Sequence, residues 1–180
     1  PTTAPHVRSA FSERDVMVLD GGACARGIES TVISLVDDPP RVLRQGFISP
    51  AQIEQALGRA VVVGAPPGEG SILASPGLLA RHYAPRTPAA LFDASQWPSV
   101  VSARSAPVAV LTHRRERDVA PPHHLLRLPV DDQGYAGALY SALRAADDIG
   151  AAAILIERPG EIGPLWDAIR DRLSRATTPE

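Results

Sequence analysis

The chain has 180 residues, of which 44% are hydrophobic, so it is long enough to bury the core of one ordinary domain or of two small ones. A net charge of -2 provides no broad basic surface for a nucleic-acid backbone, so strong direct nucleic-acid binding is not expected. No run reaches the roughly 20 apolar residues of a membrane span, and a single cysteine suits a reducing compartment, so a cytoplasmic protein is expected.

The first 63 residues alternate short apolar runs with turn residues. Thr2 and Thr3 can cap a helix that continues to about Phe11. A second helix is predicted over residues 49–58, because Ser49 and a proline suit its start and Gly58 its end. Strands are predicted at residues 16–19, 31–36, 41–44 and 60–63, the second and third able to form a hairpin.

Residues 64–87 have no helical or alternating period and are rich in glycine and proline. A long segment of this kind inside a compact protein is typical of a linker or a functional lid. We therefore expect three parts: a first domain over residues 1–63, an interdomain linker or lid over 64–87, and a second domain over 88–180.

The second domain again alternates strands and helices. Strands are predicted at residues 89–92, 108–111, 124–128 and 152–156, with helices over 135–147 and 162–175. The last helix is amphipathic, and Arg172 is predicted on its polar side, opposite Leu173. The fold class is therefore α/β, with a small Rossmann-like parallel sheet covered by helices. No Gly-x-Gly-x-x-Gly motif follows any of these strands, so dinucleotide binding is not supported.

Three clusters could carry chemistry. One is residues 1–7, because a helix N-terminus can hold a phosphate, although simple capping by the threonines is the preferred explanation. Ser30 and Thr31 stand at the entry of one predicted strand and Arg44 at the end of the next, so neighbouring strands could form a pocket for a carboxylate or phosphate. Turn chemistry at a strand start is the alternative explanation. In the linker, residues 81–83 combine a cation, a titratable ring and an aromatic face, which suits a nucleotide, although surface loops also carry such residues by accident.

These motifs together resemble the Sua5 branch of the YrdC/Sua5 family. The shared motifs are Thr-Thr-Ala-x-His-Val at residues 2–7, Gly-Ile-Glu-Ser-Thr-Val at 27–32, Val-Leu-Arg-x-Gly at 42–46, Ser-Pro-Gly-x-x-x-Arg-His-Tyr-Ala-Pro at 75–85, and the segments 143–147 and 171–173. They occur in the family's order and span nearly the whole chain. The resemblance implies a partial YrdC-like mixed sheet that a linker joins to a Sua5 domain.

The resemblance also implies an activity and its residues. L-threonine and bicarbonate would form a carbamate that attacks the α-phosphate of ATP, usually with Mg²⁺, and releases pyrophosphate. A downstream transferase complex that modifies tRNA would use the product. Ser30 and Thr31 would border threonine, and no residue is assigned as catalytic or as a metal ligand. The residues implied to approach or cover ATP are Thr2, Arg44, Arg81, His82 and Tyr83.

The chain also departs from the family pattern. The family's lysine-bearing phosphate cradle is not among these 180 residues, and all 18 residues counted as Lys+Arg are arginines. Gln45 stands where a proline is usual. The chain alone is therefore expected to be an incomplete enzyme that binds ATP weakly. The alternative is a non-catalytic nucleotide-binding or interaction module.

Overall fold

The computed structural model describes residues 1–64 and 84–177. Four parallel strands form the centre of the C-terminal part, in the order β4-β7-β5-β6. Their bounds are β4 Ala89–Phe92, β5 Val108–Thr112, β6 His124–Arg127 and β7 Ala153–Glu157. All five residues of β5 are buried, because this strand lies inside the sheet and carries apolar side chains toward both faces. The predicted Rossmann-like parallel sheet is confirmed.

Helices cover both faces of this sheet. On one face lie α4 (Asp132–Asp148) and α5 (Pro164–Thr177), and on the other lie the 3₁₀ turn η1 (Ala94–Gln96) and α3 (Trp97–Ser102). The Asp131 side chain caps α4 by accepting from the backbone N–H of Gly134 at 2.7 Å. The buried side of α4 holds hydrophobic residues at helical spacing: Tyr135, Leu139, Leu143 and Ala146.

A smaller three-stranded sheet forms from the first part of the chain, in the order β1-β2-β3. β1 (Val32–Ser34) and β2 (Arg41–Arg44) are antiparallel, as the predicted hairpin requires, and β3 (Val62–Val63) lies parallel to β2. Between them runs α2 (Pro50–Leu57), which Ser49 caps in a capping box and Gly58 ends at φ 67°. The mixed sheet expected of this part is thus confirmed.

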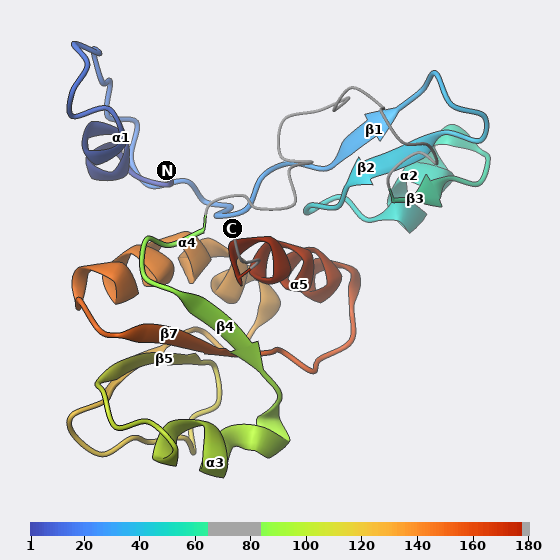
Figure 1. Cartoon of the computed structure of the whole chain (residues 1–180). Helices are drawn as coiled ribbons and strands as arrows, with labels where there is room; N and C mark the ends of the chain where they lie inside the picture. The colour runs from blue at the N-terminus through green and yellow to red at the C-terminus, as the bar shows by residue number, and fades with distance from the viewer. Residues whose placement is uncertain (65–83, 178–180) are drawn as a thin grey trace.

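The first part of the chain packs directly on the helices of the second. α1 (Ala4–Ala10) and the three-stranded sheet lie on the side of α4 and α5 that faces away from the parallel sheet (Figure 1). Ile28 belongs to the same buried cluster as the inner faces of α4 and α5, and Phe47 packs against that cluster. A methyl group at Gly27 would lie 2.2 Å from the carbonyl oxygen of Ala136, so only glycine fits against α4 at this position.

Two predictions from the sequence were wrong, and one helical stretch was missed. Residues 16–19 form no strand; Met17 is 87% exposed and no strand in the described part of the chain pairs with this run. The helical residues 94–102 were not predicted, because this stretch is short and contains a proline. Arg172 was placed on the polar side of its helix but is buried, as described below.

Within residues 1–64 and 84–177, no helix combines the length and the apolar character that a membrane span requires.

Candidate functional site

Ser30, Thr31 and Arg44 lie close together. Arg44 is opposite Val32 in the β1–β2 ladder, and its Nε donates to the carbonyl oxygen of Ser30 at 3.1 Å. The Thr31 hydroxyl donates to the carbonyl oxygen of Ile48 at 2.7 Å. The hairpin thus brings the Arg44 guanidinium to the backbone of a segment that carries two hydroxyl side chains, and these donor types suit an anionic ligand.

Gly46 allows the chain after Arg44 to lie directly against residues 29–31. A methyl group at this position would lie 2.5 Å from the backbone nitrogen of Thr31 and 2.6 Å from the carbonyl oxygen of Glu29. Both distances are shorter than any ordinary carbon contact. The strand entry at residues 29–31 and the chain after Arg44 therefore touch backbone to backbone, which explains why a glycine follows Arg44 so closely.

The carboxylate of Glu29, just before Ser30, is held by the C-terminal helices. Arg172 Nε on α5 donates to Glu29 Oε2 at 2.8 Å, and the Tyr140 hydroxyl on α4 donates to the same oxygen at 3.2 Å. Arg172 also donates through Nη2 to the carbonyl oxygen of Gln45 at 2.9 Å. A proline at position 45 would offer the same carbonyl, so this contact tolerates the departure from the family pattern. One buried arginine thus joins the segment that carries Ser30 and Thr31 to the segment that carries Arg44.

Burial opposes ionisation of Glu29, but hydrogen bonding from Arg172 and the Arg172 and Arg44 charges hold its pKa below the ordinary 4.5. The ionised form therefore stabilises the fold above pH 4.5, and this contribution disappears as the pH falls through the lower folded pKa. We expect Glu29→Gln to be less stable than the unsubstituted chain at neutral pH and to lose stability less steeply in acid. Urea unfolding at several values from about pH 7 to about pH 3 measures this.

The matched control is Glu13→Gln, because Glu13 is an exposed carboxylate of the same N-terminal part. This substitution should leave the stability curve unchanged. Some acid dependence should persist in Glu29→Gln, because the pKa of Glu161 is lowered as well: burial raises it, but the hydrogen bond from His113 and the nearby charges outweigh burial. Identical curves for Glu29→Gln and the unsubstituted chain would contradict the interpretation.

Thr2 lies beside α4, the helix whose Tyr140 contacts Glu29. Its side chain is buried, and its Oγ1 is 3.2 Å from His6 Nδ1 and 3.3 Å from the Ser141 hydroxyl oxygen on α4. Burial and the nearby Arg144 guanidinium lower the pKa of His6, which favours the neutral ring whose Nδ1 accepts the Thr2 N–H. Ser141 follows Tyr140, so Thr2 and Glu29 rest on adjacent residues of α4. Among the described residues, no hydrogen bond joins Thr2 to the Ser30–Arg44 pair.

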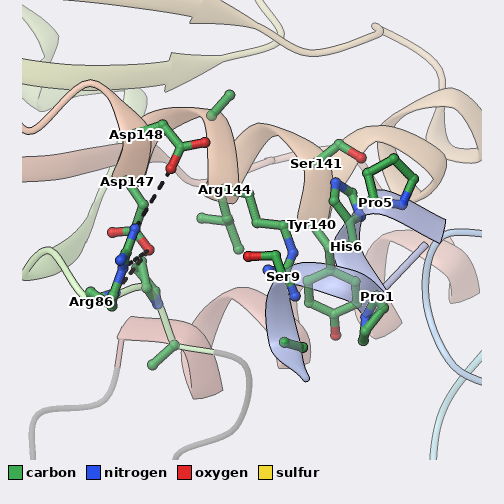
Figure 2. Close-up of a pocket in the computed structure, with 15 residues that line it drawn as sticks. Pro1, Pro5, His6, Ser9, Arg86, Tyr140, Ser141, Arg144, Asp147 and Asp148 are labelled. Atoms are coloured by element: carbon green, nitrogen blue, oxygen red, sulfur yellow. Dashed lines mark hydrogen bonds and ion pairs between the residues drawn. The ribbon is translucent and has the colours of Figure 1, made fainter. Parts of the chain in front are cut away.

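A groove of about 680 Å³ lies between α1 and α4, beside residues 84–86. Figure 2 shows His6 and Arg144 on its walls and Arg86 paired with two carboxylates at one end. The Asp147 carboxylate accepts the backbone N–H groups of Arg86 at 2.9 Å and Thr87 at 2.8 Å. The chain is therefore anchored to α4 where it leaves the predicted linker. Tyr140 lines this groove and also donates to the Glu29 carboxylate, so one residue of α4 links the groove to the segment that carries Ser30.

The three linker residues expected to cover a nucleotide, Arg81, His82 and Tyr83, lie outside the described residues. Their placement over the pocket stays a prediction, as does the division of the chain at residues 64–87. Residues 1–64 and 84–177 contain no group of three or more His, Cys, Asp or Glu side chains able to hold a metal ion.

Two family models together match almost the whole chain. The model described as "Threonylcarbamoyl-AMP synthase, C-terminal domain" matches residues 48–178, and the model described as "Telomere recombination" matches residues 1–46. The chain belongs to the Sua5 family of threonylcarbamoyl-AMP synthases. The resemblance inferred from the motifs is thereby confirmed.

Sua5 relatives match along nearly the whole chain. Threonylcarbamoyl-AMP synthase of Schizosaccharomyces pombe is 30% identical and the match covers 99% of this chain and 49% of the relative. Threonylcarbamoyl-AMP synthase of Pyrococcus abyssi is also 30% identical, and the match covers 98% of this chain and 54% of that relative. The crystal structure of P. abyssi Sua5 complexed with L-threonine superposes with a TM-score of 0.82 at 27% identity, covering 98% of this chain and 54% of that one. The chain spans about half the length of these relatives.

Sequence reasoning gave no role to Glu29, Tyr140 or Arg172. The one signal was that Glu29 and Arg172 stand inside motifs shared with the Sua5 family, at residues 27–32 and 171–173. Because these motifs are more than a hundred residues apart, only the fold shows that they meet.

Proposed function

We propose that this chain forms part of the substrate site of a threonylcarbamoyl-AMP synthase. In the proposed reaction, an oxygen of the carbamate made from L-threonine and bicarbonate attacks the α-phosphorus of ATP. The bond from that phosphorus to the bridging oxygen breaks, and pyrophosphate leaves with the electron pair. The enzyme is then a nucleotidyltransferase, and such an in-line displacement asks the protein mainly for positioning and for positive charge.

Ser30 and Thr31 are the residues proposed to border L-threonine. The Ser30 hydroxyl is exposed and makes no hydrogen bond within the described part of the chain, so it can donate to a carboxylate or carbamate oxygen. The Thr31 hydroxyl already donates to Ile48, so its remaining lone pairs suit the ammonium group of an amino acid. The two neighbouring hydroxyls would thus distinguish the two ends of threonine.

Arg44 is proposed to contact the ATP phosphates beside the threonine site, with Thr2 on the nucleotide side and Arg81, His82 and Tyr83 as the covering lid. The solved structure of a P. abyssi Sua5 variant, in which an adjacent histidine and tyrosine are both replaced by alanine, superposes with a TM-score of 0.81. The His-Tyr pair of this chain is His82-Tyr83. Any Mg²⁺ would be brought by the ATP phosphates, since it usually keeps several waters and few protein ligands.

The observation that carries the proposal is the 3.1 Å contact of Arg44 Nε with the Ser30 carbonyl oxygen. It places the residue proposed for the phosphate next to the residue proposed for threonine, and the attack requires these two ligands to be adjacent.

The product would pass to a transferase complex that carries out the t6A modification of tRNA in the cytoplasm. This chain alone is proposed to turn over little, because its residues include no lysine-bearing phosphate cradle.

The test is exchange of labelled pyrophosphate into ATP, measured with the product of the whole open reading frame and with the 180-residue chain. We expect exchange that requires both threonine and bicarbonate. Arg44→Met should lower kcat/KM for ATP about 100-fold or more, as loss of a transition-state donor does. Ser30→Ala should raise KM for threonine roughly tenfold, the value of one hydrogen bond to a charged group.

The matched control is Arg41→Met, because Arg41 lies on the same strand, toward Asp37 and the hairpin turn. It should leave both constants nearly unchanged. Equal losses in the Arg41 and Arg44 variants would contradict the assignment. Nucleotide binding without exchange, in the product of the whole open reading frame, would favour the non-catalytic module instead.

A further inference from the structure

We infer that Arg172, on the last helix of the chain, is a positioning residue for the Ser30–Arg44 pocket and makes the C-terminal domain part of the threonine site. The inference deepens the proposed function and rests on it for the identity of the ligand. It gives the C-terminal helix pair a role in substrate binding.

The first step is that Arg172 is committed to the pocket segments. Only 3% of its side chain is exposed, and the charge is compensated by Glu29 at 2.8 Å and Asp171 at 2.6 Å. A buried guanidinium is strongly destabilising when its donors lose their partners. The fold therefore favours conformations in which Glu29 and Asp171 stay paired with Arg172. Leu173 and Ile169 of the same helix are fully buried in the C-terminal core, which fixes the position from which Arg172 reaches out.

The second step is what Arg172 grips. Nε binds the Glu29 carboxylate, one residue before Ser30, and Nη2 binds the Gln45 carbonyl, one residue after Arg44. The fork of the guanidinium spans the two chain segments that form the pocket. A change in either contact shifts a residue adjacent to a proposed ligand contact.

The third step is that other contacts from the C-terminal helices point to the same segments. The Tyr140 hydroxyl of α4 reaches the Glu29 carboxylate, and Gly27 touches the α4 backbone. Gly46 in turn touches the backbone of residues 29–31. The pocket therefore has a rigid connection to α4 and α5, and displacing Glu29 moves Ser30 and Arg44 together.

The test compares Arg172→Met with Arg175→Met in the 180-residue chain. Arg175 lies one turn further along α5 and shares Asp171 with Arg172, so its variant removes an ion pair of the same helix while the Arg172 contacts with Glu29 and Gln45 remain. Hydrogen–deuterium exchange should be roughly tenfold faster in residues 27–31 and 44–48 of Arg172→Met, the value of a lost hydrogen bond to a charged group. Strands β5 and β7 should keep their protection, whereas a general loss of stability would affect them too.

Threonine affinity supplies the second readout, by calorimetry on the same proteins and by KM in the product of the whole open reading frame. We expect Arg172→Met to weaken threonine about tenfold or more while kcat changes less, because the residue orients the site without touching the reacting atoms. Arg172→Lys should lie between Arg172→Met and the unsubstituted chain, since a single ammonium cannot hold both acceptors in the fork geometry.

If Arg172→Met does not fold, Glu29→Gln decides, because it removes the ion pair while keeping the side-chain volume. Unchanged hydrogen–deuterium exchange of residues 27–31 and 44–48 in Arg172→Met, or in Glu29→Gln, overturns the inference. Threonine affinity of Arg172→Met equal to that of Arg175→Met overturns it too. Faster exchange confined to these segments, in proteins that never bind threonine, would uphold the positioning role and refute the proposed threonine site.

Discussion

Substitution Gly46→Ala is expected to abolish the pocket, lowering threonine affinity about 100-fold, as misplacement of binding groups by about 1 Å does. The added methyl group meets the Thr31 nitrogen at 2.5 Å and the Glu29 oxygen at 2.6 Å. Both are backbone atoms, so no side-chain rotation relieves the clash. The segments must separate, which breaks the Arg44 contact with the Ser30 carbonyl. We expect the free energy of unfolding to fall by about 1–3 kcal/mol, as in overpacked cores.

The matched control is Gly137→Ala. A methyl group at Gly137 in α4 meets nothing within 4 Å, and alanine suits a helix interior, so this variant should be more stable by roughly 1 kcal/mol. Calorimetric titration with threonine and urea unfolding measure both variants. If Gly46→Ala bound threonine like Gly137→Ala, the backbone contact at Gly46 could not be what holds the pocket together.

Substitution Glu157→Leu is expected to lower the free energy of unfolding by about 3 kcal/mol, because it leaves two arginines without their shared carboxylate. Glu157 ends β7 with no exposed side-chain surface, and Arg114 and Arg117 approach its Oε1 at 3.1 Å each. Thr112 donates to the other oxygen. The two arginines are 33% and 20% exposed, so partial rehydration keeps the loss at the lower end of the range for broken buried pairs.

The control is substitution of Arg158, the residue after Glu157. Arg158 pairs with Asp93 in the open, and Arg158→Met should change stability by at most about 1 kcal/mol. Adding Arg114→Met and Arg117→Met to Glu157→Leu should restore part of the loss, since no unpaired charge then remains. Urea unfolding measures all three proteins. A loss in Glu157→Leu no greater than in Arg158→Met would show that the buried network contributes nothing.

Much of the fold followed from local sequence. The continuous apolar run at residues 152–156 predicted a strand buried on both faces, and β7 is such a strand. Ser49 and Gly58 marked both ends of α2, because capping depends on a few adjacent residues. The run at residues 16–19 failed, because a strand also needs a neighbour to pair with, and an apolar run does not show whether one is present.

For the candidate site, the sequence by itself determined which residue types could bind an anion, and the predicted hairpin showed how Arg44 could come near Ser30 and Thr31. It also determined, through its motifs, the family to which the chain belongs. Only the tertiary structure decided that Arg172, although it follows the polar residues of its helix, is buried against Glu29 and Gln45. Helical periodicity treats an arginine as solvent-facing, whereas its burial depends on a carboxylate 143 residues away in the chain.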